Sequence, residues 1–423
     1  ASVDFVVLEA ADRIGGRVLT DHSVAEGRPL EIGALMIHGK HACTHRWVEE
    51  CGLHARSIPT FKRARWWRDG RYTKYPWMLL PFHPTFGPRA FYQAVYSLPK
   101  KMARFPGPDL SLADWLARVG ALPGARQIVT LLHAHAAAAE PDEVGVMGPA
   151  NEATLAEEEF GYNNFQLVEG YSELLARRSV PLRERIRLGT RVTGIRRSSN
   201  DVRVEAVGGD GKPAQEIRAK RVVVALPLGI LKAGVVAFEP PLSVAKRRAI
   251  EVIAFGDAMA LQMRLKGGNL MERLGDFSTL WGGTPSTFHR PYVAARDPPR
   301  TLAAFITGKE ARGRSAMGDA ELLQVTLEEL ETILPSNVQV GEVEAMAVGR
   351  WPTDPFIRGG YTFLPPHATV DHRKDLATPE DGVLFFAGEA THTHGEPATV
   401  HGAIETGYRA ADEVLASLRG APP

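Results

Sequence analysis

The chain has 423 residues, and its 50 basic and 49 acidic residues leave a formal net charge of +1. This balance gives no electrostatic argument for nucleic acid or a membrane as a partner, and no run reaches the roughly 20 apolar residues of a membrane-spanning helix. Because a single hydrophobic core stops growing at about 250–300 residues, we expect two domains. The two cysteines, Cys43 and Cys51, are too few for a disulfide framework and favour a reduced, cytoplasmic setting.

The first predicted element is a strand at Phe5–Leu8, which ends on Glu9 and runs into a Gly-Gly-Arg loop. Two similar runs follow much later, "VVVAL" at Val222–Leu226 and "VLFFA" at Val383–Ala387. Short runs that are apolar throughout are typical of parallel strands buried on both faces. Since the three runs lie far apart in the chain, we expect one sheet domain assembled from separated segments.

The segments between these strands differ in character. Residues 61–164 are rich in aromatic side chains and then show helical patterns such as "LSLADWLARVG". Residues 186–226 alternate apolar and polar residues around turn signals, which predicts a β-meander that leads back into the parallel sheet. Residues 236–374 mix strand-like and helical segments, and Thr399–Gly420 has apolar residues at helical spacing with a glycine at its end.

Glu9 stands where an acid in a dinucleotide-binding fold accepts the hydroxyls of the adenosine ribose. In the loop that follows, Gly15 and Gly16 allow the backbone to approach a pyrophosphate, and Arg13 and Arg17 supply charge and donors. The G-x-G-x-x-G turn that belongs about 20 residues before such an acid is missing, because no glycine precedes Glu9. We therefore expect the natural protein to have roughly 30 further residues upstream that carry this turn.

A second motif, "GVLFFAGEATHTHGEPATVHGAIETG", runs from Gly382 to Gly407. It predicts a buried strand, a sharp turn at Gly388–Glu389 and a helix that begins near Thr399. Backbone N–H groups at a helix start favour an anionic or electron-rich ligand atom. The small residues Gly402 and Ala403 would let a flat ring lie against this helix end.

Five segments in this order, "VVLEAADRIGGRV", "EIGALMIHG", "ALPLGIL", "GRWPTDPFIRGGY" and "LFFAGEATHTHGEPATVHGAIETGYRAA", closely resemble the flavin-dependent amine oxidases, and "IHG" resembles the polyamine oxidase branch. The resemblance covers essentially the whole chain. It implies an α/β fold with an FAD-binding, Rossmann-like domain, a doubly wound parallel sheet plus the β-meander, from residues 1–60, 165–235 and 375–423. An interleaved α+β substrate-binding domain would take residues 61–164 and 236–374.

The resemblance also implies individual roles. Glu9 would bind the ribose, and Gly16 with Arg17 would line the pyrophosphate and flavin. Val192 would meet the adenine through its backbone. The remaining positions would surround the isoalloxazine ring and ribityl chain: Gly33, Ala34, Gly388, Glu389, Thr399, Val400, Ala403 and Trp351.

The catalytic candidates are Tyr361, Trp351 and His38, which match positions beside the flavin and the amine. Each has an ordinary structural alternative as a packed core residue. The cluster His38, His41, Cys43 and His45 matches no standard zinc spacing, so we expect no metal. His392 and His394 are interpreted as loop residues near the flavin rather than as ligands.

Two positions depart from the family pattern. Ala260 stands where the family places a lysine that assists oxygen chemistry, and Lys266 is six residues too far along, about 20 Å of strand. Oxygen is therefore in doubt as the electron acceptor, and another acceptor is an alternative. Gly360 stands where some relatives carry the cysteine that attaches flavin covalently, so we expect FAD to be bound non-covalently.

The leading prediction is an FAD-dependent oxidase that converts a small amine, polyamine-like or otherwise primary or secondary, to an imine that water hydrolyses, with oxygen reduced to hydrogen peroxide. A flavin dehydrogenase or desaturase with poor oxygen use is one alternative, and a degenerate scaffold without catalysis is another. The sequence leaves the amine and the oligomeric state open. Acids along a substrate tunnel could come from Glu157–Glu159 or Asp257, although acidic runs are commonly solvated faces.

Overall fold

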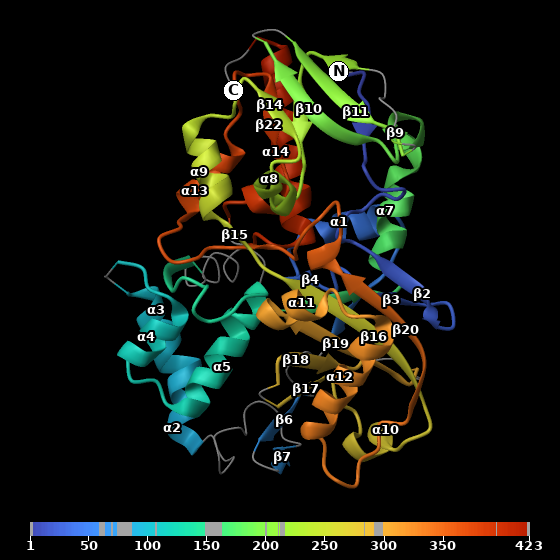
Figure 1. Cartoon of the computed structure of the whole chain (residues 1–423), viewed down its shortest axis with the longest axis vertical. Coiled ribbons are helices and arrows are strands. Elements are labelled where there is room, and N and C mark those ends of the chain that lie inside the picture. Colours follow the sequence, from blue (N-terminus) through green and yellow to red (C-terminus); the bar gives the residue numbers. More distant parts are fainter. Residues whose placement is uncertain are drawn as a thin grey trace.

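Two short pairs of parallel strands, each joining distant segments of the chain, lie in the upper half of the molecule (Figure 1). Strand β1 (Val7–Leu8) pairs with β9 (Ile186–Arg187), and β13 (Val222–Val224) pairs with β22 (Leu384–Phe386). These pairs confirm that parallel strands come from widely separated parts of the chain. The computed structural model describes residues 3–58, 64–68, 71–73, 87–105, 108–148, 163–198, 201–209, 211, 216–282, 284–291, 299–394 and 396–420.

The predicted β-meander is present beside these pairs. Its four strands lie in the order β12-β11-β10-β14, with β10 at Arg191–Arg197, β11 at Val202–Val207, β12 at Ile217–Ala219 and β14 at Ala237–Glu239. The β10–β11 and β11–β12 pairs are antiparallel, whereas β14 runs parallel to β10. Strand pairing thus joins residues up to Glu239 to this half, while the division into two domains stays a prediction.

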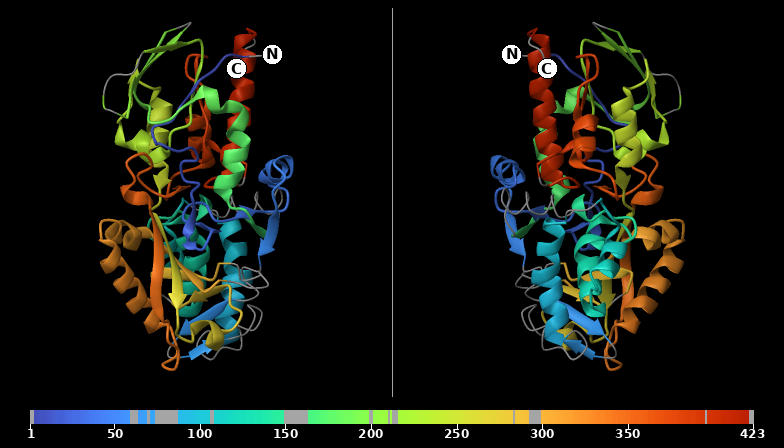
Figure 2. Two further views of the ribbon diagram at one scale, coloured as in Figure 1. Left: turned by 90° about the vertical axis from the view of Figure 1, so that its right-hand side faces the viewer. Right: turned by 90° about the vertical axis from the view of Figure 1, so that its left-hand side faces the viewer.

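Helices cover the parallel strands. The longest is α14 (Val400–Leu418), which begins where the sequence predicts and is capped by Thr399. The helices and short segments of this half are α1 (Thr44–Glu50), α7 (Tyr171–Ser179), η4 (Val180–Arg185), α8 (Leu228–Ala233), α9 (Val244–Val252), α13 (Val370–Ala377) and η6 (Glu389–Thr391). Figure 2 shows both chain ends at the same end of the molecule, beside α14.

The lower half contains a seven-stranded sheet with the order β20-β16-β19-β18-β17-β6-β7. Its strands are β20 (Glu342–Arg350), β16 (Ala258–Lys266), β19 (Thr301–Thr307), β18 (Ser286–His289), β17 (Thr279–Trp281), β6 (Arg65–Arg68) and β7 (Arg71–Thr73). Helices α10 (Leu270–Leu274), α11 (Gly308–Arg314) and α12 (Asp319–Thr332) accompany the sheet, and η5 (Trp351–Thr353) follows β20. The core between sheet and helices includes Leu261, Phe288 and Leu330, which have no exposed surface.

A helical lobe lies beside this sheet (Figure 1). It consists of α2 (Gly87–Tyr92), the π-helical segment η2 (Gln93–Ser97), α3 (Leu98–Ala103), α4 (Leu112–Arg118), α5 (Pro123–His133) and η3 (His135–Ala137). The first three run on continuously, and Ala90, Ala94, Leu98 and Met102 are their buried residues in the core around Trp115. This spacing of four residues places one face of the continuous helix in the core and the opposite face in solvent.

Short strand pairs join the two halves. They are β2 (Thr20–Ala25) with β3 (Arg28–Glu31), β4 (Ile37–His38) and β5 (Ala55–Ile58) with β8 (Asn164–Leu167), and β15 (Ala254–Phe255) with β21 (Thr362–Phe363). Gln262 on β16 donates through Nε2 to the carbonyl of Glu31, 2.7 Å away. The loop after β3 is therefore fixed against the large sheet.

Candidate functional site

The loop after β1 is organised around the Glu9 carboxylate. Its Oε1 accepts the Ala11 N–H at 2.8 Å, and the Glu9 backbone bonds to Arg187 and Thr190 at 3.0 and 2.8 Å. These bonds lie next to the start of β10, which contains Val192, and Val192 packs in the same core as Leu8. No partner of Oε2 is found among the described residues, so this oxygen is free to accept a ligand hydroxyl.

The Gly-Gly loop depends on backbone conformations that favour glycine. Gly15 and Gly16 have φ angles of +106° and +55°, and a Cβ on Gly16 would meet open space. The Arg13 guanidinium donates to the carbonyls of Ile14, Gly16 and Val18 at 3.2, 2.7 and 3.1 Å. Arg13 therefore holds the loop in shape, and its role toward a ligand stays a prediction.

Arg17 joins three segments that are far apart in sequence. Its Nη1 donates to the carbonyl of Gly360 and to Oε1 of Glu389, both at 2.8 Å. The guanidinium carbon also lies 5.5 Å from the centre of the Phe255 ring. A quarter of the Arg17 side chain remains exposed, at 25%. The Gly-Gly-Arg loop, the segment before β21 and the turn after β22 thus meet at one point.

Glu389 is the buried anion of this junction, with only 3% of its side chain exposed. It accepts hydrogen bonds from Thr362 Oγ1 at 2.6 Å and from the Ala398 N–H at 2.9 Å, in addition to Arg17. Burial acts to raise the pKa of Glu389, but the charges of Arg17 and Arg373 and the hydrogen bonds outweigh it and keep the pKa below its ordinary value. Glu389 is therefore ionised at neutral pH.

Gly33 lies where two backbones touch. A Cβ on Gly33 would stand 2.0 Å from the carbonyl oxygen of Arg17, and the Ala34 N–H donates to that same oxygen at 3.0 Å. Trp351, which is 6% exposed, donates through Nε1 to the carbonyl of Ile32 at 2.9 Å. The backbone around Gly33 is thus held between the Arg17 loop and the end of β20.

The start of α14 closes the other side. Thr399 Oγ1 accepts the Gly402 N–H at 3.0 Å, and the Ala403 N–H reaches the Thr399 carbonyl. The Val400 N–H has no partner among the described residues, and Val400 packs against the same core as Ala34. Gly388 has a φ angle of +112°, and a Cβ there would meet nothing within 4 Å. The helix start therefore offers an unused donor beside open backbone.

The catalytic candidates Tyr361 and His38 are each hydrogen-bonded to a distant part of the chain. Tyr361 donates through its hydroxyl to the carbonyl of Ala136 at 2.9 Å, and burial followed by the charge of Glu389 raises the pKa of Tyr361 well above its ordinary value. His38 Nδ1 lies 2.9 Å from Asn164 Oδ1, so Nδ1 donates and Nε2 carries the lone pair. Burial lowers the pKa of His38 although the bond to Asn164 opposes this, so the imidazole is neutral.

Ala260, where the resemblance leads us to expect a lysine, lies on β16. Ala260 is 8% exposed in the middle of β16, where it pairs with Gly349 and Phe305. Lys266 lies at the end of β16, is 67% exposed and is 3.3 Å from Glu344. Lys266 therefore cannot replace the missing amine at position 260.

The acids considered for a substrate tunnel were Asp257 and Glu157–Glu159, and the structure describes only the first. Asp257 Oδ2 accepts from Arg312 Nε at 2.7 Å, so its charge is compensated by α11 rather than offered to a cation. Glu157–Glu159 lie outside the described residues. Gly360, which replaces the flavin-attaching cysteine, has little room for a side chain, because its Cβ would lie 3.0 Å from Ala258.

Sequence reasoning missed three residues of the junction. Thr362 and Arg373 support Glu389, since Arg373 Nη1 donates to Thr362 Oγ1 at 2.7 Å and Thr362 donates to Glu389. Phe255 lies under Arg17. Thr362 directly follows a quoted motif and could have been found there. Phe255 lies outside the quoted motifs, and a buried arginine on a polar helix cannot be distinguished from a solvated one by sequence.

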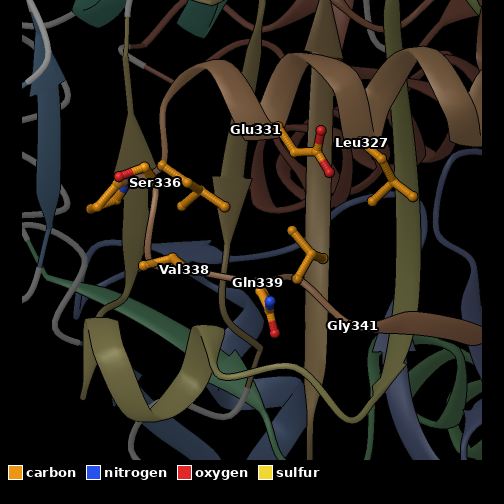
Figure 3. A pocket seen from close by; sticks show the side chains of 9 residues that line it. Leu327, Glu331, Ser336, Val338, Gln339 and Gly341 are labelled. Carbon is orange, nitrogen blue, oxygen red and sulfur yellow. The ribbon is translucent and has the colours of Figure 1, made fainter.

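The cavity drawn in Figure 3 lies elsewhere. It has a volume of about 380 Å³ between the end of α12 and the loop at residues 335–341, with Glu331 as its single ionisable group. Within the described ranges, no three His, Cys, Asp or Glu side chains are grouped so that they could hold a metal ion. Nor does any helix in the described part of the chain combine the length and apolarity needed to cross a membrane.

These features define a dinucleotide-binding α/β fold joined to a large, mostly antiparallel sheet. The donors and spaces fit an FAD molecule: a free carboxylate oxygen at Glu9, glycine backbone without obstruction at Gly16 and Gly388, and an open N–H at the start of α14. The chain belongs to the flavin containing amine oxidoreductases, whose family model matches residues 1–415. FAD is the cofactor of this family, as the motifs predict.

Relatives and solved structures agree with this assignment. The chain is 29% identical to polyamine oxidase 3 of Oryza sativa subsp. japonica over 98% of its length and 84% of that protein. It is 30% identical to mouse lysine-specific histone demethylase 1B over 61% of its length, which spans 31% of the demethylase. Cyclohexylamine oxidase from Brevibacterium oxydans shares the fold, with a TM-score of 0.80, 20% identity and coverage of 98% and 94% of the two chains. Wild-type putrescine oxidase bound to putrescine has the same TM-score at 19% identity.

Proposed function

We propose that this protein oxidises a small amine at the carbon next to nitrogen and delivers the hydride to FAD. The observation that carries this proposal is the junction at Arg17, where Gly360 and Glu389 are both held at 2.8 Å. It brings together the loop after β1, the segment of Gly360 and Tyr361 before β21, and the turn after β22. The flavin supplies the electron-accepting ring, and the protein supplies binding, orientation and electrostatics.

The residues of the junction have separate roles in this proposal. Glu9 accepts the ribose hydroxyls, Arg17 faces the pyrophosphate and flavin, and Val400 donates its N–H toward the pyrimidine edge of the ring. Val192 contacts the adenine. The flavin is non-covalent because Gly360 has no thiol to attach it.

His38, Trp351 and Tyr361 would surround the amine. An amine must be neutral for its lone pair to assist hydride loss, and an apolar, aromatic pocket favours the neutral form by desolvation. The neutral His38, with a lone pair on Nε2, could accept a proton or hydrogen bond from the amine nitrogen. The polyamine and putrescine oxidases among its relatives suggest a diamine or polyamine as the substrate class.

Anaerobic mixing of the FAD-loaded protein with putrescine, spermidine, spermine and cyclohexylamine tests the reaction. We expect at least one of them to bleach the visible absorption of the flavin. His38→Gln should slow this bleaching by about 10²-fold, as expected when a positioned acid–base group is lost. His22→Gln changes an exposed histidine on β2 and serves as the control. Bleaching by dithionite but by no amine would contradict the proposal.

A second candidate, an amine dehydrogenase that uses an acceptor other than oxygen, is favoured by Ala260. Stopped-flow mixing of the reduced protein with oxygen should show slow reoxidation, which Ala260→Lys accelerates by about tenfold if it restores electrostatic help near the reacting atoms. Lys266→Ala should leave the rate unchanged, because Lys266 is solvent-exposed. Fast reoxidation of the unmodified protein would exclude this candidate and favour the oxidase.

A further inference from the structure

A hollow of about 440 Å³ lies in the helical lobe between the ends of α3 and α4. Its lining consists of Lys100, Lys101, Arg104, Phe105, Trp115, Arg118 and Val119. Both helices lie at the outer edge of the molecule, away from α14 (Figure 1). The hollow is therefore separate from the junction at Arg17.

The floor of the hollow is apolar and firmly placed. Trp115 is 1% exposed and belongs to the core of the lobe, and Phe105 and Val119 are partly buried against that core. They pack against Met102 and Leu116, which are 3% and 2% exposed. A flat or aliphatic group that lay on this floor would remain in contact with a fixed surface.

The rim carries four cations without counter-ions. Lys100, Lys101, Arg104 and Arg118 are exposed, and in the described part of the chain none of them forms an ion pair or donates a side-chain hydrogen bond. Other arginines of this protein do form ion pairs, as Arg264 does with Glu26 and Arg300 with Glu272. Four like charges around one hollow repel one another unless an anion joins them.

These cations are also not needed to complete the helix ends. Basic side chains in a last helical turn commonly interact with its free carbonyls. Here backbone N–H groups already reach three of those carbonyls, from Phe105 to Met102 at 3.1 Å, from Val119 to Trp115 at 2.9 Å and from Ala121 to Leu116 at 2.9 Å, and among the described residues no lysine or arginine of the rim bonds to any of them. The four side chains therefore remain available to a ligand.

We propose that this hollow binds an organic anion that joins a phosphate or carboxylate head to an apolar body. The head would lie among Arg104, Arg118 and the two lysines, and the apolar body would lie on Trp115, Phe105 and Val119. Guanidinium groups suit such heads because they donate two parallel hydrogen bonds to them. An amine substrate would be repelled by the same rim, so this ligand is chemically distinct from the substrate of the proposed reaction.

Calorimetric titration of the protein with naphthyl phosphate tests the proposal without reference to flavin or activity. We expect saturable binding, with inorganic phosphate and the neutral naphthalenemethanol each at least about tenfold weaker, because each offers only half of the recognition. Arg104→Gln/Arg118→Gln should weaken binding by about tenfold or more. The control Arg247→Gln/Arg248→Gln removes the same charge from two exposed arginines of α9 and should change binding by less than about twofold.

Equal loss of binding in both double variants would show that net charge alone attracts the probe and would overturn the proposal. Equal affinity for naphthyl phosphate and naphthalenemethanol would overturn it as well, since the rim would then contribute nothing. Binding to phosphatidylglycerol vesicles without binding of naphthyl phosphate would replace the hollow by a membrane-facing surface and would likewise contradict it. Retained thermal stability in the Arg104→Gln/Arg118→Gln variant excludes misfolding as the cause of any loss.

Discussion

Glu389 shows how single residues hold this protein together. It is a buried carboxylate that two arginines, a threonine and a backbone N–H neutralise, and removing one partner of such a pair leaves the others unpaired. We expect Glu389→Gln to lower the free energy of unfolding by about 3 kcal/mol, measured by urea denaturation. Glu26→Gln breaks an ion pair in which Glu26 is 82% exposed and should cost less than about 1 kcal/mol. Equal effects of the two variants would contradict the role of burial.

Glu31 changes stability with pH in the direction opposite to Glu389, because its pKa is raised whereas that of Glu389 is lowered. Burial raises the pKa of Glu31 from 4.5 to about 7, although the Tyr171 N–H and Thr20 hydroxyl bond to it. The folded protein therefore holds a proton that the unfolded chain releases, so this contribution to stability is complete below pH 4.5 and is lost as the pH rises to 7.

Glu31→Gln should remove this pH dependence. Between pH 5 and 7 the unfolding free energy of the unmodified protein should fall relative to that of Glu31→Gln, by at most about 1.4 kcal/mol per pH unit. Parallel curves for the two proteins, recorded by urea denaturation in a pH series, would show that Glu31 has an ordinary pKa.

Many residues of the candidate site could be predicted from sequence, because glycines and charged residues within motifs can be recognised without the structure. Glu389, Arg17 and Gly33 were all predicted as site residues. In the structure Arg17 bonds to Glu389, and the Gly33 backbone lies against the Arg17 carbonyl. The three bonds of Arg13 to carbonyls of its own loop were not predicted, because the shape of a tight glycine turn is not visible in sequence, and its contact with a ligand stays a prediction. Arg373 was not predicted, because its burial depends on how α13 packs.

At the scale of elements, the site depends on contacts between loops that only small residues permit. Gly33→Ala places a methyl group 2.0 Å from the Arg17 carbonyl, so the loop after β3 must move. We expect a loss of about 2 kcal/mol or more in unfolding free energy and a weaker affinity for FAD. Gly313→Ala in α11 meets nothing within 4 Å and should be neutral or slightly stabilising. Thermal unfolding of the two variants decides this, and an unchanged midpoint for Gly33→Ala would contradict the close packing.

The start of α14 offers a second test at this scale. Thr399→Ala removes the acceptor of the Gly402 N–H and should cost about 1 kcal/mol of stability, whereas Thr399→Ser keeps the hydroxyl and should resemble the unmodified protein. Thermal unfolding and FAD titration of both variants measure the effect. A serine variant as impaired as the alanine variant would show that the cap is unimportant.

The elements themselves were predicted well where their patterns are local. The three apolar strands, the meander and the last helix all lie where the sequence predicts, because short apolar runs and helical periodicity leave clear patterns. The expectation that these strands are buried on both faces is correct for β22 but wrong for β1 and β13, where Val7 and Val223 are 41% and 43% exposed. The seven-stranded sheet was not predicted as a sheet. Its strands are paired across long stretches of chain, such as β17 with β6, and no local pattern records which strands will pair.

In the molecule as a whole, we propose that segments from both ends of the chain and from its middle form one binding site for FAD and an amine. The identity of the amine bears on the lining of the pocket and does not change where the hydride must go. The claim therefore depends on electron transfer from an amine to a flavin bound beside Arg17.

The most direct measurement is an anaerobic titration of the FAD-loaded protein with a diamine or polyamine, repeated with Arg17→Ala. We expect the amine to reduce the flavin in the unmodified protein. Arg17→Ala should lose FAD or show flavin reduction at least about tenfold slower, because the charge facing the flavin is gone. Flavin that stays oxidised with every amine, or that is reduced equally well in Arg17→Ala, would contradict the proposal.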